Sequence, residues 1–315
     1  MRLKVLDLFC GGGGSSLGAE AIGGEVVCGI DAWDIAIKTF QSIFPKARAL
    51  NLELTEKTRP KDIGIKNSDI DLILASPECT NHTCAKGAKP RNEDSKRTAR
   101  YILNFASDLN PRWIAIENVV QMRNWVGYEP LIDDLRDLGY NIREQIIDAS
   151  TLGVPQSRRR LFLLCDQEKI PDAVPIQDNS FVNVEQILDA PGTWTSRPLY
   201  RKNRATRTLE RAERAIASLG REKNFLIVYY GSDASGGWQP LDRPLRTLTT
   251  IDRFGLVTWD GNTPMLRMLQ VSELKKAMGF SADLIHGTRR DKVKILGNGV
   301  CPPVMEAVLR TLTRF

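Results

Sequence analysis

Hydrophobic residues in the first half of the chain form short runs, separated by longer stretches whose apolar positions recur at helical spacing. The stretches 33–44 and 97–109 predict helices on this pattern. Such alternation is typical of a doubly wound α/β domain with a mostly parallel sheet covered by helices on both faces. The runs predict strands at 3–9, 25–30, 71–76, 112–118, 141–149 and 160–165.

The pattern changes after Cys165, where loop-rich and basic stretches interrupt the alternation. We expect a second, smaller domain here, with strands at 225–231 and 245–257. The stretch 265–280 and a final helix over 303–314 look like structure returning to the first domain. The predicted division is a larger domain of 1–165 plus 265–315 and a smaller domain of 166–264.

Composition limits the class of protein. The 315 residues include 42% hydrophobic ones, enough for a substantial core, and 44 Lys and Arg against 38 Asp and Glu give a net charge of +6. This excess favours a polyanionic partner but also suits an ordinary basic enzyme. No apolar run approaches the ~20 residues of a membrane span, and the start shows no secretory signal, so we expect a cytoplasmic or nucleoid-associated protein.

The six cysteines are too sparse for a disulfide framework in a chain of this length. Cys79, His82 and Cys84 superficially suggest a metal site, but no second ligand pair with zinc-like spacing accompanies them. We therefore expect no metal.

The segment DLFCGGGGSSLGAE, 7–20, predicts a strand, a glycine-rich turn and a helix. Backbone amides and the helix N-terminus then face the carboxyl end of the strand, which suits a nucleotide-like cofactor. The next strand ends near Asp31, whose carboxylate can accept hydrogen bonds from ribose hydroxyls; the alternative is an N-cap of the following helix. Glycine-rich turns also occur in dehydrogenases and as purely structural turns.

Three further segments place reactive side chains at strand ends. Cys79 follows a predicted strand and a proline-containing turn, where active sites of such sheets lie. Glu117, in ENV, ends another strand, although a satisfied structural glutamate fits equally. Arg158 and Arg160 share a face of a strand and suit oxygens of a base or phosphate, or else are solvated edge charges.

Taken in order, DLFCGGGG, SPEC, ENV, QSRRR, RMLQVSE and GNGV resemble the motif series of the DNA (cytosine-5)-methyltransferase family across nearly the whole chain. The resemblance implies the fold of S-adenosylmethionine-dependent methyltransferases, with the smaller domain recognising the target. It implies a nucleophile at Cys79, a carboxylate for the cytosine N3 edge at Glu117, and arginines near the base at Arg158 and Arg160. Positions implied to bind S-adenosyl-L-methionine are Asp7, Phe9, Cys10, Gly11, Gly13, Asp31, Ala32, Asn51, Leu52, Pro77, Asn298 and Val300.

The implied reaction is methyl transfer to C5 of a cytosine flipped out of duplex DNA, through a covalent bond between Cys79 and C6. Arg267 and Glu273 match a pair that steadies the recognition domain. The segment 86–100 carries six positive charges and is expected to close over phosphates, unless it is a solvated loop; the basic segment 195–214 also suits DNA. We expect a monomer that does not associate with membranes. A cognate restriction endonuclease is a possible partner.

The chain departs from the family pattern at two positions. Glu78 precedes the cysteine where the family usually has proline, and a carboxylate that points inward raises the pKa of a neighbouring thiol. Asn51 stands where the family often has an acidic residue. Four alternatives remain: a tRNA cytosine-5 methyltransferase, transfer of a modified alkyl group, a catalytically weak DNA-binding or donor-sensing protein, and a nicotinamide oxidoreductase.

Overall fold

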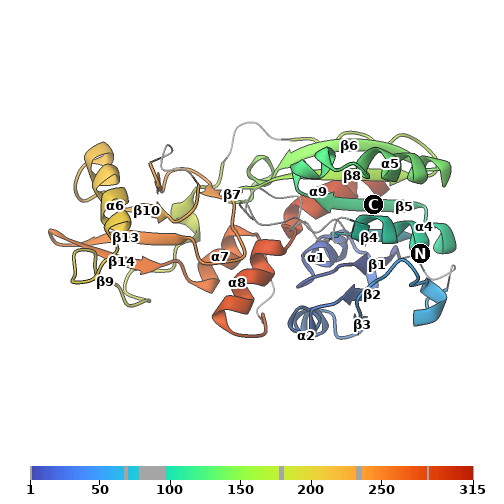
Figure 1. Ribbon diagram of the computed structural model, residues 1–315, viewed down its shortest axis with the longest axis horizontal. Helices are drawn as coiled ribbons and strands as arrows, with labels where there is room; N and C mark the ends of the chain where they lie inside the picture. The colour runs from blue at the N-terminus through green and yellow to red at the C-terminus, as the bar shows by residue number, and fades with distance from the viewer. Residues whose placement is uncertain are drawn as a thin grey trace.

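A seven-stranded sheet with the order β3-β2-β1-β4-β5-β8-β6 forms the larger part of the molecule (Figure 1). The computed structural model describes residues 2–66, 70–77, 97–176, 181–231, 236–281 and 284–314. Only β8 runs antiparallel to its neighbours, so the predicted mostly parallel sheet is confirmed. The strands are β1 (Lys4–Leu8), β2 (Glu25–Asp31), β3 (Arg48–Asn51), β4 (Leu72–Ala75), β5 (Trp113–Asn118), β6 (Asn141–Asp148) and β8 (Arg159–Asp166).

Helices cover both faces of this sheet because successive strand residues point to opposite sides. Val5 belongs to the core shared with α1 and α9, whereas its neighbour Leu6 belongs to the core shared with α4 and α5. This arrangement confirms the doubly wound fold. The helices around the sheet are α1 (Gly14–Ala21), α2 (Asp34–Ile43), α4 (Ile102–Leu109), α5 (Tyr128–Asp137) and α9 (Pro302–Thr313), with 3-10 turns η1 (Pro60–Ile63), η4 (Arg97–Tyr101), η5 (Val120–Asn124) and η6 (Ala149–Leu152).

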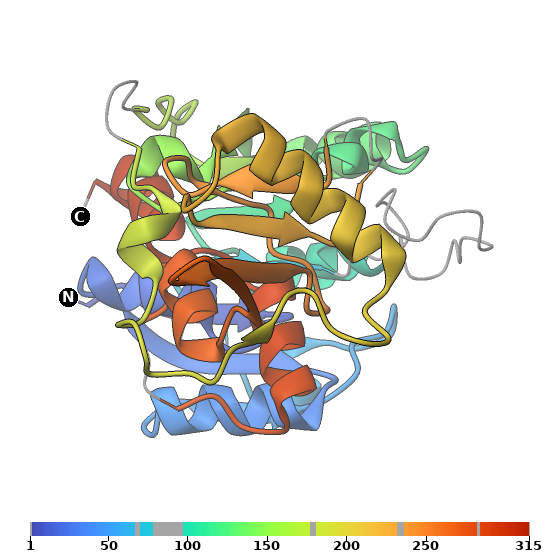
Figure 2. The same ribbon diagram turned by 90° about the vertical axis from the view of Figure 1, so that its left-hand side faces the viewer.

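A second sheet of five antiparallel strands, ordered β11-β10-β13-β14-β9, lies at the other end of the long axis. Figure 2 shows it end-on, with α6 across its outer side. Phe225 and Ile227 pack beneath α6, while Leu226 and Val228 join the core of the larger unit. The elements are β9 (Arg197–Pro198), α6 (Thr206–Leu219), β10 (Phe225–Val228), β11 (Trp238–Pro240), β13 (Phe254–Asp260) and β14 (Thr263–Met268).

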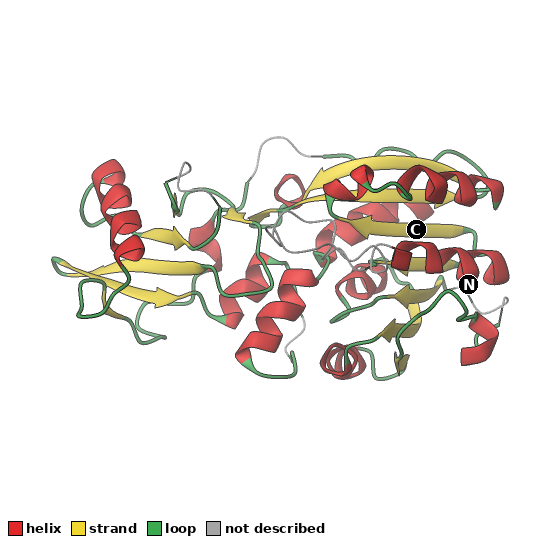
Figure 3. Ribbon diagram, in the orientation of Figure 1, coloured by secondary structure: helices red, strands yellow, loops and turns green. Residues whose placement is uncertain are grey.

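Two short helices, α7 (Val271–Ala277) and α8 (Arg289–Asn298), lie between the two sheets (Figure 3). A 3-10 turn, η7 (Val184–Ile187), packs against α7 where the chain leads toward the smaller sheet. The segment that leads into the smaller sheet therefore packs against α7, and the segment that returns from that sheet continues into α7. Within the described ranges, no helix is long and apolar enough to cross a membrane.

The prediction of one strand over 245–257 is wrong. The stretch contains β12 (Leu245–Arg246), which pairs in parallel with β7 (Gln156–Ser157), and the beginning of β13. Hydrogen bonds to the 155–157 segment draw the chain away from the smaller sheet between these strands. The predicted boundary at 265 falls inside β14, which pairs with β13 along its length.

Candidate active site

The glycine-rich turn between β1 and α1 has an unusual backbone. Phe9, Gly11 and Gly13 have φ angles of 59°, 52° and 86°, in the left-handed region that glycine adopts most readily. The amide of Cys10 donates to the Ile30 carbonyl at 3.0 Å, which fixes the turn over the end of β2. A Cβ atom on Gly11 would meet nothing within 4 Å, so open space borders the turn and a ligand can approach its backbone.

Asp31 lies at the end of β2 and contacts this turn directly. Its carboxylate accepts hydrogen bonds from the amides of Gly11 at 2.9 Å and Trp33 at 2.8 Å. Burial raises the carboxyl pKa, and the two amides oppose that shift. Trp33, rather than Asp31, is the N-cap of α2, so the capping alternative for Asp31 is wrong.

Asn51 ends β3 beside Asp31. Its amide group donates to the carbonyls of Ala32 at 2.9 Å and Asp31 at 3.2 Å, and the Leu52 amide donates to the Asp31 carbonyl at 3.0 Å. The structure therefore brings together the four predicted donor-site residues at the ends of β2 and β3. The side chains of Ala32 and Asn51 are exposed.

Asp7 is fully buried on β1, beneath the turn. One carboxylate oxygen accepts a hydrogen bond from Ser16 Oγ at 2.6 Å, while Oδ1 has no hydrogen-bond partner among the described residues. Burial, which outweighs the Ser16 hydrogen bond, raises the Asp7 pKa to about 7. Asp7 is thus a buried carboxyl group with a raised pKa beneath the glycine-rich turn.

The C-terminal segment closes onto the same turn. A Cβ atom on Gly14 would lie 2.3 Å from the Val300 carbonyl oxygen, so only glycine permits this approach of α1 to the segment. Val300 is buried and Asn298 is exposed. Gly14 and Val300, almost the whole chain apart in sequence, are therefore in close contact.

Pro77 is buried just beyond β4, and its carbonyl accepts a hydrogen bond from Asn118 Nδ2 at 3.2 Å. Asn118 follows Glu117, so the peptide that leads toward Cys79 passes beside the end of β5. Cys79 itself lies outside the described residues. Glu78, His82, Cys84 and the segment 86–96 lie outside them as well.

Glu117 and Arg160 form a buried ion pair. Arg160 Nε lies 3.0 Å from Glu117 Oε1, and the side chains are 15% and 8% exposed, respectively. Burial raises the Glu117 pKa, and the charges of Arg160 and Arg158 oppose the shift. This pairing does not fit a solvated edge charge for Arg160, and it gives Glu117 a buried partner, as a satisfied structural glutamate would also have. The pair borders a small cavity lined by Glu117, Ala149, Arg158, Arg160, Phe162, Val300, Cys301 and Val304.

Arg158 lines the same cavity, but its guanidinium is directed toward the backbone. It donates to the carbonyls of Leu248 at 3.1 Å, Gly297 at 2.9 Å and Gly299 at 3.0 Å, and the side chain is only 3% exposed. No pattern in the sequence marks these partners, because they lie about 90 and 140 residues away.

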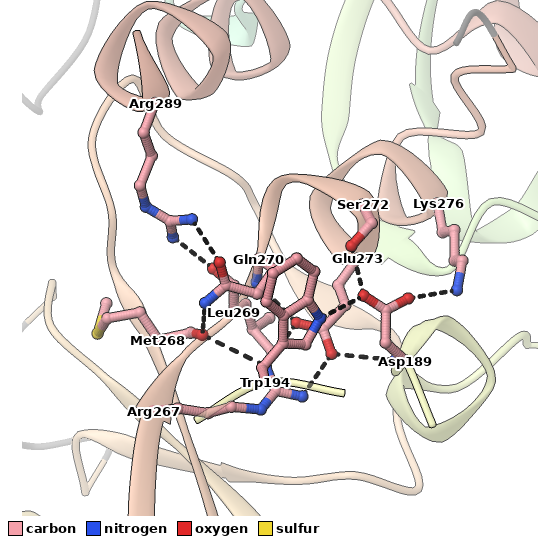
Figure 4. A network of polar contacts seen from close by, with 10 residues as sticks. All are labelled: Asp189, Trp194, Arg267, Met268, Leu269, Gln270, Ser272, Glu273, Lys276 and Arg289. Carbon is pink, nitrogen blue, oxygen red and sulfur yellow. Dashed lines mark hydrogen bonds and ion pairs between the residues drawn. The ribbon is translucent and has the colours of Figure 1, made fainter. Parts of the chain in front are cut away.

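Arg267 and Glu273 form a bidentate ion pair, with distances of 2.7 and 2.6 Å (Figure 4). Glu273 also accepts from the Asp189 amide at 3.0 Å, so the pair joins β14, α7 and the segment that leads into the smaller sheet. Sequence reasoning missed Asp189, which accepts hydrogen bonds from Ser272, Trp194 and Lys276. An acidic residue in a loop offers no distinguishing pattern.

A larger cavity, of about 640 Å³, lies elsewhere. Its described lining residues include none of the predicted site positions, although two aromatic side chains and Arg100 border it. The buried pair of Glu117 and Arg160 borders the smaller cavity instead. The larger cavity is lined by Glu56, Arg100, Tyr101, Leu103, Asn104, Trp125, Val126, Gly127 and Pro130.

The residues around the turn fit S-adenosylmethionine. Asp31 presents a half-buried carboxylate where ribose hydroxyls would donate, and the open face of Gly11 admits a ligand close to the backbone. The Asp7 Oδ1 atom beneath the turn has no hydrogen-bond partner among the described residues, so it can still accept one. Asn298 and Val300 would close the site from the other side.

Comparison with known proteins points the same way. The family described as C-5 cytosine-specific DNA methylase matches residues 3–314. The type II methyltransferase M.HindV of Haemophilus influenzae is 32% identical over 162 residues, which cover 51% of this chain and 52% of that protein. The tRNA (cytosine(38)-C(5))-methyltransferase of Spodoptera frugiperda is 30% identical over 167 residues, covering 51% and 49%. The chain thus spans about half the length of these curated relatives.

Solved structures share the fold over the whole chain. A methyltransferase of Entamoeba histolytica, EhMeth, superposes with a TM-score of 0.70 at 16% identity and covers 100% of this chain and 98% of its own. A variant of Spodoptera frugiperda DNMT2 gives a TM-score of 0.71 at 19% identity, with 99% and 100% covered. At these identities the likeness shows the fold alone.

Proposed function

This chain belongs to the C-5 cytosine-specific DNA methylase family, and we propose that it transfers a methyl group from S-adenosylmethionine to C5 of a cytosine in duplex DNA. The observation that carries the proposal is the buried Glu117–Arg160 pair. A buried acid beside an arginine suits the N3 and O2 edge of a cytosine, because one offers a proton or hydrogen bond and the other a cation. A nicotinamide oxidoreductase would leave this pair without a role.

The proposed reaction begins with Cys79, because cytosine C5 is too weak a nucleophile to be methylated directly. Its thiolate forms a bond to C6 as the C5–C6 double bond opens, and the electron pair makes C5 nucleophilic. Glu117 stabilises the charge at N3, and Arg160 holds O2. After C5 takes the methyl group, a base removes the C5 proton and the Cys79–C6 bond breaks, which restores the double bond and the thiolate.

The donor would be held by the residues that meet at the turn. Asp31 would bind the ribose hydroxyls, Asn51 and Leu52 would lie near the adenine, and the 298–300 segment would close the pocket. S-adenosylmethionine supplies the electrophilic methyl group. The base must leave the duplex to reach Glu117, since a stacked cytosine is inaccessible.

Charge supports a nucleic-acid substrate. The basic segment 195–214 contains seven Lys and Arg against two Asp and Glu. It includes β9 and the greater part of α6, which packs on the smaller sheet. A basic surface attracts a phosphate backbone whatever its sequence.

Bisulfite sequencing of DNA from cells that express the chain tests the proposal. We expect protected cytosines in one sequence context, and their absence with Cys79→Ala. The Glu168→Gln variant, changed at an exposed ion pair beyond the end of β8, is a matched control that should methylate normally. Duplex DNA with 5-fluorocytosine in that context should form a covalent adduct with the native chain and not with Cys79→Ala. Unmodified DNA throughout would contradict the proposal.

The tRNA relative makes RNA the second candidate substrate. Sequencing of bisulfite-treated RNA from the same cells distinguishes the two, because RNA methylation without DNA methylation would assign the tRNA reaction. A DNA substrate would place the protein in the cytoplasm or nucleoid. The type II relatives support a cognate restriction endonuclease as partner, and we propose a monomeric enzyme.

A further inference from the structure

Arg158 joins two segments that belong to different parts of the proposed enzyme. One is the donor turn, residues 297–299, whose carbonyls at Gly297 and Gly299 accept from Nη2. The other is the recognition strap, residues 245–249, whose Leu248 carbonyl accepts from Nη1. A single buried guanidinium therefore fixes the distance between the two segments.

The recognition strap is continuous with the smaller sheet. It connects β11 to β13, two strands of that sheet, and is fastened to the 155–157 segment by hydrogen bonds. Thr247 Oγ1 donates to the Ser157 carbonyl at 2.8 Å, and the Leu248 amide donates to Gln156 Oε1 at 2.8 Å. A displacement of the smaller sheet would pull directly on the strap.

The donor turn is wedged between the strap and α1. A Cβ atom on Gly297 would lie 2.3 Å from the Thr249 carbonyl oxygen, so these two backbones are in close contact. On its other side, the Val300 carbonyl presses on Gly14 at the start of α1. The strap cannot move toward the donor turn without displacing residues of the donor site.

We propose that Arg158 is a positioning residue that couples donor binding to DNA binding, a role that rests on the proposed function. Its planar guanidinium reaches carbonyls of both segments in a fixed geometry, which a lysine ammonium cannot reproduce. DNA bound to the smaller sheet would hold the recognition strap in place. Arg158 would in turn hold the donor turn in the arrangement that binds the donor. By reciprocity, bound donor would raise affinity for DNA by the same factor.

The test measures this coupling at equilibrium. The affinity for S-adenosylhomocysteine is determined by calorimetry with and without a duplex that carries the context found by bisulfite sequencing. We expect the duplex to tighten binding at least about 5-fold in the native chain. With Arg158→Lys that factor should fall close to 1. Arg112→Lys, an arginine just before β5 and at the opposite end of the β5–β8 strand pair from Arg158, should keep the native factor.

Thr247→Val provides a second variant, because it removes one hydrogen bond of the strap at a partly buried side chain outside the hydrophobic core. In this variant the factor by which duplex DNA tightens S-adenosylhomocysteine binding should be lower, and S-adenosylhomocysteine should still bind. Thr247→Val therefore tests the inference if Arg158→Lys does not fold. If the Arg158→Lys chain folds and duplex DNA still tightens its binding of S-adenosylhomocysteine by the native factor, the inference is overturned and the proposed function stands. If the Arg158→Lys chain does not fold, a native factor in Thr247→Val has the same meaning. A native chain that binds neither ligand overturns both.

Discussion

Arg160 on β8 lies beside Glu117 on the neighbouring strand β5, with 3.0 Å between Nε and Oε1. The ion pair orients the carboxyl group inside a small cavity whose rim includes Val300 of the C-terminal segment. Burial raises the Glu117 pKa, and the charges of the two arginines oppose that shift.

Replacing Glu117 tests its proposed role directly. Glu117→Gln keeps the size of the side chain but removes its ability to exchange a proton, so we expect the single-turnover rate to fall about 10²-fold or more. Affinity for S-adenosylhomocysteine should change little, since Asp31 and the glycine-rich turn are untouched. Glu168→Gln should retain the native rate. A native rate in Glu117→Gln would remove Glu117 from the chemistry.

Asp7 should make stability depend on pH. Its folded pKa of about 7 lies above the ordinary value of 3.8, so the folded chain binds the proton more tightly than the unfolded chain. This group's contribution to the free energy of unfolding therefore declines as pH rises from about 4 to about 7. Asp7→Asn should gain stability relative to the native chain over that range, by a change on the order of 4 kcal/mol.

Urea unfolding at pH 5 and pH 8 measures this difference without any ligand. Asp34→Asn, at an exposed side chain that pairs with Lys38, is the control and should show little dependence. If the difference in the free energy of unfolding between Asp7→Asn and the native chain is the same at both pH values, Asp7 does not titrate in this range.

The Arg267–Glu273 pair should contribute strongly to folding. The two side chains are 9% and 0% exposed, and Glu273 also accepts from the backbone of Asp189 and Gln270. Glu273→Ala leaves a buried arginine and two amides without their acceptor, so we expect a loss of about 3–5 kcal/mol. The Arg267→Ala, Glu273→Ala double variant should lose less than the sum of the single losses. Additive losses in urea unfolding would show that the pair is not coupled.

Salt dependence tests the basic segment. Replacing the exposed residues Arg201, Lys202 and Arg207 by glutamine should weaken DNA binding and reduce the slope of log K against log salt by about 0.9 for each lost phosphate contact. Neutralising Lys46, Lys61 and Arg136, exposed on the larger unit, is the control. Equal slopes in the two triple variants would mean that the basic segment does not touch phosphates.

Local sequence determined the alternating elements of the larger sheet, because hydrophobic periodicity reflects which face of a strand or helix is buried. It also determined the left-handed turn at Gly11 and Gly13, since few other residues tolerate that backbone. The resemblance placed Glu117 and Arg160 near the same base, and the structure adds that the two side chains pair with each other. The antiparallel direction of β8 was not readable, because a buried strand has the same pattern in either direction.

The partners of Arg158 and the path of residues 245–257 depend on the tertiary structure and could not be predicted from local sequence. Leu248, Gly297 and Gly299 offer backbone carbonyls, which every residue has, so no side-chain pattern marks them as acceptors. β12 leaves the smaller sheet because Pro155, Gln156 and Ser157 supply its hydrogen bonds from about 90 residues away. Periodicity reports burial along a short window, whereas these contacts depend on which distant segments the completed fold brings together.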